Sequence, residues 1–288
     1  MRFSFVILHY NSLEETLKCV ESIKHTQKGT DYRIVIVDNN SPDGTGNELE
    51  RQLGQEEDVT IIHSKQNLGF ARGNNLGFHY AKYELKSDFI ILQNADTMVL
   101  QEEFQKLVTD EYKQSEFAVL GPLVKTPHPP FNSNPGTDKL PDIDDFKKQL
   151  LKYRLHYYLT YLHLDGILTR YHIKKVGPSL IRNIDIINHK AYNVKLHGCF
   201  LVFSPQYIKK FDGLNDKTFL FNEEPLLFIR LRQNNLISVY LPQVVIFHKE
   251  DASTSNTYSA ENTKNRFIYK CKIQSTKVVI DELLKKEM

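Results

Sequence analysis

Arg33-Ile34-Val35-Ile36-Val37-Asp38 decides the fold class of this chain, together with a second run, Phe89-Ile90-Ile91-Leu92-Gln93-Asn94-Ala95-Asp96. Each run is almost continuously apolar up to its polar end, which predicts a strand buried on both faces of a parallel sheet. Open parallel sheets bind ligands at the carboxyl ends of their strands. Asp38 and Asp96 are therefore predicted to lie at one edge of such a sheet, where two acidic groups suit a ribose and a divalent cation.

Apolar segments on both sides extend the pattern. Residues 3–8 and 59–63 are predicted as two more strands. Helices are predicted over 13–23, where Asn11 or Ser12 can serve as the cap, near 47–53, and from the loop at 67–73 through Tyr83. Strands that alternate with helices in this way predict an α/β fold with a doubly wound, mostly parallel central sheet flanked by helices.

The composition is that of an ordinary globular protein. Of 288 residues, 41% are hydrophobic and 25% charged, and the formal net charge of +2 does not point to a nucleic-acid partner. Cys19, Cys199 and Cys271 lack metal-ligand spacing, which predicts reduced, mostly buried thiols. The apolar run at 3–8 is too short for a signal peptide, and no stretch reaches the roughly 20 apolar residues of a spanning helix. A cytoplasmic location is therefore predicted.

The middle of the chain changes character. Residues 126–136 form a turn-rich break, and a segment rich in lysine, arginine and tyrosine follows over about 142–175. Basic amphipathic helices of this kind can lie on an anionic membrane surface, here the inner face of the plasma membrane. A helix that covers the core with its lysines in water has the same composition, because lysine stems and tyrosine rings serve both purposes. Both interpretations stay open.

The alternation returns in the last third. Residues 198–204, 237–240 and 244–247 are predicted as strands, the last ending at His248. A helix is predicted to begin at Glu223-Glu224-Pro225 and to run past Arg232, since proline is tolerated in a first turn. The charged tail from 261 is predicted to be helical.

Taken together, these segments resemble the family 2 glycosyltransferases with the GT-A fold, especially the bacterial rhamnosyltransferase-like branch. The resemblance spans roughly 1–270, is weakest over about 126–195, and rests on six motifs in the expected order. The motifs are Val35-Ile36-Val37-Asp38-Asn39-Asn40-Ser41, Asn67-Leu68-Gly69-Phe70-Ala71-Arg72-Gly73-Asn74-Asn75, Leu92-Gln93-Asn94-Ala95-Asp96, His197-Gly198-Cys199-Phe200, Phe219-Leu220-Phe221-Asn222-Glu223-Glu224, and the strand ending in His248.

The resemblance implies an organisation of the chain. Residues 1–125 form the half that binds the nucleotide-sugar donor, and 126–195 a helical insertion that contacts acceptor or membrane. Residues 196–260 form the acceptor and catalytic half of the same domain, followed by a helical tail over 261–288. For donor binding the resemblance implies a set of residues led by Asp38, on the base or ribose. The others are His9, Asn11, Asn40, Asn67, Arg72, Asn75, Asn94, Asp96, Gly198 and Arg230.

The resemblance also implies a divalent cation, Mg²⁺ or Mn²⁺, bound by Asp96 and His248. Such an ion stabilises the negative charge that grows on the leaving diphosphate, and an imidazole suits Mn²⁺ better than Mg²⁺. Asn94 stands where many members carry the first aspartate of a DxD-type element, which lowers the charge of the site. The alternatives are a capping role for Asp96 and a locally bonded, strand-end role for His248.

Glu223-Glu224 stands where the family usually has Glu-Asp. By position Glu224 is the general base that takes the proton of the acceptor hydroxyl, and Glu223 is the second candidate. The structural alternative is an acidic cluster at a helix start, where the macrodipole favours negative charge.

The predicted function is an inverting sugar transfer from a nucleotide-diphosphate donor to a hydroxyl of a bacterial surface glycan, free or lipid-linked. dTDP-rhamnose is the favoured donor and a UDP-hexose the alternative. Two other functions stay open. The substitutions at Asn94 and Glu224 permit a nucleotide-sugar-binding protein without catalysis. A nucleotidyltransferase shares a similar sheet but needs a glycine-rich basic loop after the first strand, where residues 9–15 are acidic and lack glycine.

Overall fold

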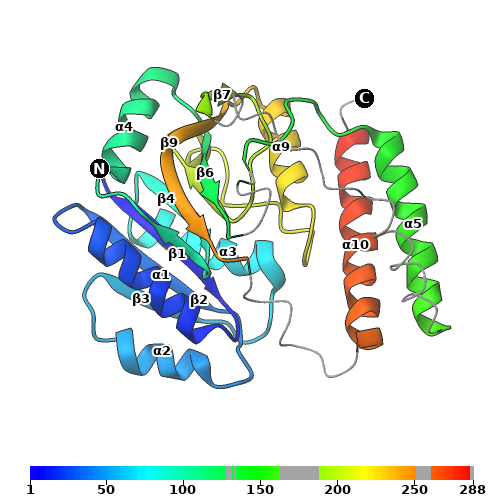
Figure 1. The fold of residues 1–288 in the computed structure, drawn as a ribbon, viewed down its shortest axis with the longest axis horizontal. Helices are drawn as coiled ribbons and strands as arrows, with labels where there is room; N and C mark the ends of the chain where they lie inside the picture. The colour runs from blue at the N-terminus through cyan, green and yellow to red at the C-terminus, as the bar shows by residue number, and fades with distance from the viewer. Residues whose placement is uncertain (128–131, 133, 163–187, 251–260, 286–288) are drawn as a thin grey trace.

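A computed structural model describes residues 1–127, 132, 134–162, 188–250 and 261–285. Within them a nine-stranded sheet runs through the centre of the molecule, with helices on both faces (Figure 1). The strand order is β3-β2-β1-β4-β8-β6-β9-β5, and β7 pairs with β9. The strands are β1 (Phe3–His9), β2 (Tyr32–Asp38), β3 (Val59–His63), β4 (Phe89–Asn94), β5 (Thr97–Val99), β6 (Val119–Lys125), β7 (Ala191–Tyr192), β8 (Phe200–Phe203) and β9 (Ser238–His248).

The first four strands in this order are parallel, as predicted, and their polar ends meet at one edge. In the register of the sheet His9 lies opposite Asp38, Asp38 opposite His63, and Leu8 opposite Asn94. β8 is antiparallel to β4 and β6, whereas β6 and β9 are parallel. β8 therefore joins the N-terminal and C-terminal parts of the chain in one continuous sheet.

Both faces of the sheet are buried, which explains why its strands are continuously apolar. Along β1 the side chains alternate, so that Phe5 and Ile7 enter one hydrophobic cluster and Val6 enters the other. One face is covered by α1 (Leu13–Thr26), α2 (Thr45–Leu53) and α4 (Phe104–Ser115). The opposite face is covered by α3 (Gly69–His79), α8 (Pro205–Ile208) and α9 (Glu223–Gln233). The cysteines are free and buried, as predicted.

Several predictions about elements need correction. The two strands predicted at 237–240 and 244–247 are a single strand, β9, which passes Pro242 with a shift of register against β6 between Pro122 and Leu123. Ser12 is the N-cap of α1, but its side chain makes no capping hydrogen bond. The sequence analysis did not anticipate α4, β5, β6 or β7. α3 continues, as one π-helical turn (Tyr80–Glu84), to the predicted end of its helix.

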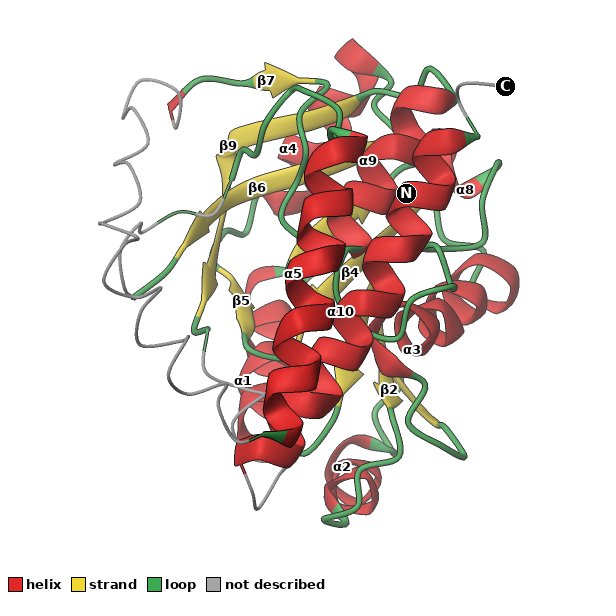
Figure 2. Ribbon diagram, turned by 90° about the vertical axis from the view of Figure 1, so that its right-hand side faces the viewer, coloured by secondary structure: helices red, strands yellow, loops and turns green. Residues whose placement is uncertain are grey.

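Two long helices lie side by side at the edge of the molecule (Figures 1 and 2). They are α5 (Ile143–Tyr161) and α10 (Glu261–Leu284). α10 is the helix predicted for the charged tail, and α5 shows that the first part of the basic segment is helical. Residues 163–175 of that segment lie outside the described residues. Ile143 packs in a cluster with Val279, and Thr160 contacts Arg266, so the pair is antiparallel. None of the helices in the described part of the chain has the length and apolar content needed to cross a membrane.

Candidate active site

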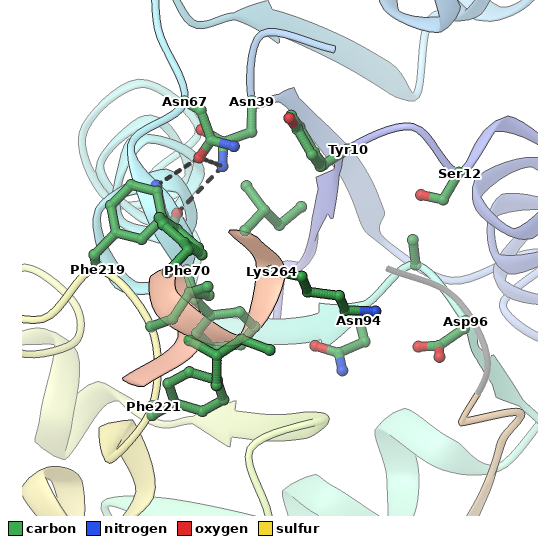
Figure 3. Close-up of a pocket in the computed structure, with 16 residues that line it drawn as sticks. Tyr10, Ser12, Asn39, Asn67, Phe70, Asn94, Asp96, Phe219, Phe221 and Lys264 are labelled. Carbon is green, nitrogen blue, oxygen red and sulfur yellow. Dashed lines mark hydrogen bonds between the residues drawn. The ribbon is translucent and has the colours of Figure 1, made fainter. Parts of the chain in front are cut away.

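A cavity of about 340 Å³ opens at the carboxyl ends of β1 and β4 (Figure 3). Its walls come from four parts of the chain: the strand ends, the loop before α3, the loop before α9 and the first turns of α10. The lining residues are Leu8, Tyr10, Ser12, Asn39, Asn67, Gly69, Phe70, Asn94, Ala95, Asp96, Phe219, Leu220, Phe221, Lys264, Phe267 and Ile268. The lining therefore combines an aromatic group with polar side chains, as is typical of small-molecule sites.

Asp38 lies at the predicted edge, but it is only 6% exposed and does not line the cavity. Its Oδ1 accepts a hydrogen bond from the backbone N–H of Ser41 (3.1 Å), and its Oδ2 lies 3.3 Å from His63 Nδ1. The next residue, Asn39, lines the cavity instead. The carboxylate is thus held directly behind the lining, where it orders the turn that follows β2.

His9 and Asn11 hold the loop after β1. The two ring nitrogens of His9 lie 2.8 Å from Thr16 Oγ1 and 2.9 Å from Thr45 Oγ1, and burial lowers the pKa of the imidazole. Asn11 has a φ of 51°, and its N–H donates to Ser41 Oγ. Asn11 Oδ1 is buried and has no hydrogen-bond partner among the described residues. Neither residue is part of the cavity lining.

Asn67 is brought to the cavity by a network with Asn39. Its Oδ1 accepts from Asn39 Nδ2 (3.1 Å) and from the N–H of Gly69 (2.9 Å). Gly69 has a φ of 77°, and a Cβ there would lie 2.2 Å from the carbonyl oxygen of Phe219. The Phe70 N–H donates to that same oxygen at 2.7 Å. Glycine is therefore required at 69 for the loop with Phe219 to approach and close the aromatic wall.

Asn75 and Arg230, two of the residues predicted for donor binding, do not line the cavity. Both amide atoms of Asn75 are hydrogen bonded to the backbone of Leu214. Arg230 Nη1 donates to Tyr207 OH (2.8 Å) and to the Gly213 carbonyl (2.6 Å). These two side chains hold one turn from both sides, and they have a structural role in the described chain.

Asn40 and Arg72 are also outside the cavity lining. Both side chains are exposed, and Asn40 has a φ of 62° in the turn after β2. Arg72 projects from the first half of α3. The geometry thus leaves Asn67, Asn94 and Asp96 as the predicted donor residues that line the cavity.

Asp96 and His248 meet as predicted, although β4 and β9 are far apart in sequence. Asp96 Oδ1 lies 3.2 Å from His248 Nε2, and both side chains are less than 10% exposed. His248 Nδ1 is buried without a hydrogen-bond partner among the described residues. Asp96 Oδ1 and His248 Nε2 face each other and could bind one divalent cation, and a carboxylate with an imidazole suits Mn²⁺ better than Mg²⁺. His248 also belongs to a second group of ligand atoms, with His197 and Cys199, that lie within 4.8 Å of one another. The residues therefore fit a divalent cation.

Glu224 reaches the same region from the N-terminus of α9. Its Oε1 accepts a hydrogen bond from the Gly198 N–H at 2.7 Å, and its side chain is 30% exposed. His197 Nε2 lies 3.9 Å from that oxygen, and the His197 ring is 5.9 Å from the ring of His248. Burial lowers the pKa of His197, which opposes protonation of this imidazole beside Glu224. Glu224, His197, His248 and Asp96 thus form a polar path, in which the two imidazole rings lie 5.9 Å apart between centres.

Glu223, the second candidate base, has a different environment. Its side chain is mostly buried, and burial raises the pKa of its carboxyl from 4.5 to about 6. Thr218 Oγ1 donates to Glu223 Oε1 at 3.2 Å, which opposes that rise only in part. The two neighbouring acids therefore differ: Glu224 is part of the polar path, whereas Glu223 is mostly buried and bonded to Thr218.

Glu223→Gln is expected to stabilise the protein at pH 8 by about 2 kcal/mol, with no effect below pH 4.5. Because the folded-state pKa is raised, the cost of ionising Glu223 in the folded protein is absent below pH 4.5 and grows as the pH rises through about 6. Urea unfolding of both proteins at the two pH values measures the difference. An equal gain in unfolding free energy at pH 8 and below pH 4.5 would contradict this prediction. Glu57→Gln, which changes an exposed glutamate, is the matched control.

The sequence analysis missed the residues that form the aromatic and basic walls. Tyr10 follows β1 directly, so its place at the sheet edge was a usable signal. Phe221 has a φ of 73°, rare for a bulky residue and often found at functional sites. Lys264 and Phe267 had no local signal, because only the packing of α10 brings them to the cavity. Figure 3 shows the Lys264 side chain extending toward the side of the cavity where Asn94 lies.

Comparison with known proteins gives matches over most of the chain. The family model described as glycosyl transferase family 2 matches residues 4–175. The low-salt glycan biosynthesis hexosyltransferase Agl10 of Haloferax volcanii is 22% identical over 270 residues, which is 92% of this chain and 74% of that protein. Dolichol-phosphate mannosyltransferase of Pyrococcus furiosus is 28% identical over 125 residues, which cover 43% of this chain but only 34% of that protein.

Solved structures share the fold. S. aureus TarS 1–349 in complex with UDP-GlcNAc superposes with a TM-score of 0.54 at 14% identity, over 99% of this chain and 72% of that one. The complex of TarS 1–349 with UDP gives a TM-score of 0.54 at 15% identity, over 86% and 60% of the two chains. At this level of identity the likeness establishes the architecture, which confirms the α/β class with a mostly parallel sheet.

Proposed function

The chain belongs to glycosyltransferase family 2, and from this premise we propose that it transfers a sugar from a pyrimidine nucleoside-diphosphate donor to an acceptor hydroxyl, with inversion. The observation that carries the proposal is the polar path from Asp96 through His248 and His197 to Glu224. This path runs from the proposed donor cavity to the partly exposed carboxylate of Glu224. Leaving-group stabilisation and proton removal are thus available on neighbouring side chains.

The nucleoside is proposed to lie between Tyr10 and the Asn39–Asn67 network. A ring on one side and amide groups on the other suit a pyrimidine, which offers a π-face and hydrogen-bonding edges. Asp38 keeps its proposed place near the base or ribose, directly behind Asn39, where its charge favours donors such as a ribose hydroxyl or a ring N–H. His9 and Asn11 support this loop without lining the cavity.

The diphosphate is proposed to lie toward Asp96, Asn94 and Lys264. Asp96 and His248 would hold Mg²⁺ or Mn²⁺, which when bound stabilises the charge on the leaving diphosphate. The Lys264 ammonium adds a positive charge to this end of the cavity from α10. Asn94 carries no charge, so this site has one carboxylate where a site with two aspartates has two. Lys264 and a bound cation are therefore balanced by less negative charge from the protein.

Glu224 is proposed to take the proton of the acceptor hydroxyl. The hydrogen bond from Gly198 holds one carboxylate oxygen, and the other faces outward toward Lys195. Among the described lining residues Asp96 is the one carboxylate, and it is paired with His248. A double displacement needs a free carboxylate nucleophile there, so a single, inverting displacement is favoured.

The identity of the sugar is the next level of the proposal. The branch resemblance favours dTDP-rhamnose, and the TarS complexes contain UDP and UDP-GlcNAc. dTDP-rhamnose and UDP-GlcNAc are both sugars linked to a pyrimidine nucleoside diphosphate, which is the group that the cavity is proposed to recognise. The acceptor is proposed to be a growing cell-surface glycan made on the cytoplasmic side, in line with the glycan-related names of the relatives.

A thermal-shift panel tests the donor. UDP or dTDP with Mn²⁺, at about a hundred times its Kd, is expected to raise the melting temperature by about 5 °C or more, because a ligand bound to the native state stabilises it by mass action. The panel includes UDP-hexoses, dTDP-rhamnose, GDP-mannose and uridine. Lys264→Gln is expected to reduce the shift with UDP and leave that with uridine unchanged, whereas Lys270→Gln, exposed on the same helix, changes neither.

The outcomes separate the competing functions. A larger shift with a purine nucleotide would contradict the pyrimidine assignment. Stabilisation by UTP or dTTP in preference to the diphosphates would favour a nucleotidyltransferase. Donor binding without any hydrolysis or transfer in the presence of Mn²⁺ would favour a nucleotide-sugar-binding protein that lacks catalysis.

A further inference from the structure

The outer face of α5 carries a stripe of exposed apolar side chains. Leu151, Leu155, Tyr158 and Leu162 follow one another at intervals of four, three and four residues, so they lie on one side of the helix. They are 65%, 57%, 67% and 64% exposed. With Tyr161, five of the ten large hydrophobic residues exposed in the described chain belong to this helix and its C-cap. We call these four residues the α5 stripe.

The orientation of α5 is fixed by the contacts of its inner face. His156 and Thr160 are buried against α10, where His156 Nδ1 lies 3.1 Å from Tyr269 OH. The Arg266 guanidinium lies 3.9 Å from the centre of the Tyr161 ring. Since this face already packs on the protein, the stripe on the opposite side points away from the core. Figure 1 shows α5 at the edge of the molecule, with α10 between it and the sheet.

Basic side chains border the stripe on both sides. Lys147 and Arg154, seven residues apart, follow one border, and Lys148 and Lys152, four residues apart, follow the other. All four are exposed. Lys147 and Lys148 are paired with acids in the first turn of α5, at 3.2 and 3.4 Å. Lys152 and Arg154 have no ion pair within the described residues, so their charges are available to a partner.

We propose that the α5 stripe docks on an anionic lipid surface, with the leucines and Tyr158 in the interface and the bordering bases at the headgroups. The charge pattern is that of a helix lying in the plane of a membrane, where apolar burial and headgroup attraction act together. The stripe extends over about 17 Å at 1.5 Å per residue, so α5 lies on the surface and does not cross it.

A second copy of the chain fits the same surface less well. A two-fold dimer brings a patch against itself, so the bases that border one stripe would meet those bordering the other. Like charges brought together in this way oppose association. Anionic headgroups supply the opposite charge along both borders, which is why a lipid surface is the occupant inferred.

Docking in this way has a consequence for the cavity. The first turns of α10, which supply Lys264 and Phe267 to the cavity, pack beside the last turns of α5. A lipid-bound chain therefore holds the cavity near the surface, where a lipid-linked glycan would arrive. This consequence rests on the proposed function, whereas lipid binding itself requires neither donor nor acceptor.

Co-sedimentation of the full chain with vesicles tests the surface. Wild-type protein is expected to bind vesicles of phosphatidylglycerol and phosphatidylethanolamine about tenfold more tightly than phosphatidylcholine vesicles, and to lose this preference at high salt. Leu151→Gln/Leu155→Gln is expected to weaken binding to the anionic vesicles about tenfold or more. Lys152→Gln/Arg154→Gln is expected to remove most of the preference for anionic lipid.

Matched variants make the result specific. Leu100→Gln/Leu284→Gln removes two leucines exposed elsewhere, and Lys28→Gln/Lys65→Gln removes two exposed lysines away from α5; both are expected to bind like the wild type. Because all these side chains are exposed, the variants are expected to keep the wild-type melting temperature. Measuring that temperature excludes loss of the fold as the cause of weaker binding. Equal binding by wild type and the Leu151→Gln/Leu155→Gln variant, or no binding to anionic vesicles, would overturn the proposal. Self-association in light scattering that this variant abolishes, without vesicle binding, would assign the stripe to a dimer.

Discussion

Glu224→Gln is expected to reduce sugar transfer by about 10²–10⁴-fold while the donor still binds, because the variant loses the proton acceptor and little else. Glutamine keeps an oxygen that can accept the Gly198 N–H, now 2.7 Å from Glu224 Oε1, so the loop before β8 stays in place. The measurement is a transfer assay under donor saturation, combined with the thermal shift that the donor produces.

Two further variants sharpen this result. Glu223→Gln separates the two neighbouring acids, because the assignment to Glu224 requires the greater loss of turnover in Glu224→Gln. Glu57→Gln, an exposed glutamate outside the cavity lining, is the matched control and is expected to leave transfer unchanged. Near-normal turnover of Glu224→Gln would contradict the assignment of Glu224 as the base. A loss of turnover confined to Glu223→Gln would assign that role to Glu223.

Asp96→Ala is expected to weaken Mn²⁺ binding about 100-fold or more and to remove most metal-stimulated transfer. Even changing a residue that only supports a metal ligand costs 10–100-fold in affinity, and Asp96 is proposed to bind the ion directly. Its carboxylate is the partner of His248 Nε2 at 3.2 Å, so the variant removes the negative member of the pair. Calorimetric titration of Mn²⁺ in the presence of UDP measures affinity independently of turnover.

The control for Asp96 is Asp216→Ala, which removes an exposed aspartate that does not line the cavity. It is expected to leave both the Mn²⁺ affinity and the transfer rate unchanged. Unaltered metal dependence in Asp96→Ala would take this residue out of the metal site. Loss of activity with normal Mn²⁺ affinity would instead indicate that Asp96 contacts the donor directly.

The prediction of Asp96 and His248 as partners came from the resemblance, while the sequence pattern placed each of them near the end of a strand. β4 and the last part of β9 were each recognisable as apolar runs with a polar last residue, and both end near the cavity. Glu224 was predicted as the base from the resemblance alone, by its position in Glu223-Glu224, whereas the local pattern indicated only a helix start. The strand and helix signals lay within a few residues of these three side chains, and the resemblance supplied their pairing and their proposed roles.

Asn75 and Arg230 show the limit of that reasoning. Each stands in a motif beside residues that do line the cavity, yet both are used to hold the turn at Gly213 and Leu214. A polar side chain near a site can point either way, because the choice depends on which distant backbone groups need a hydrogen-bond partner. That need arises only when the turn after α8 packs beside α3.

The sequence by itself determined the four parallel strands, the helices α1, α2, α3 and α9 that cover the sheet, and the edge at which Asp38, Asn94 and Asp96 gather. These features follow from the burial pattern of neighbouring residues, which is written locally in apolar runs and turn residues. Only the tertiary structure decided that Asp38 lies behind the lining, that α10 closes the cavity with Lys264 and Phe267, and that α5 turns its leucines outward. These outcomes depend on close packing and hydrogen bonding between segments far apart in the chain, which no local pattern encodes.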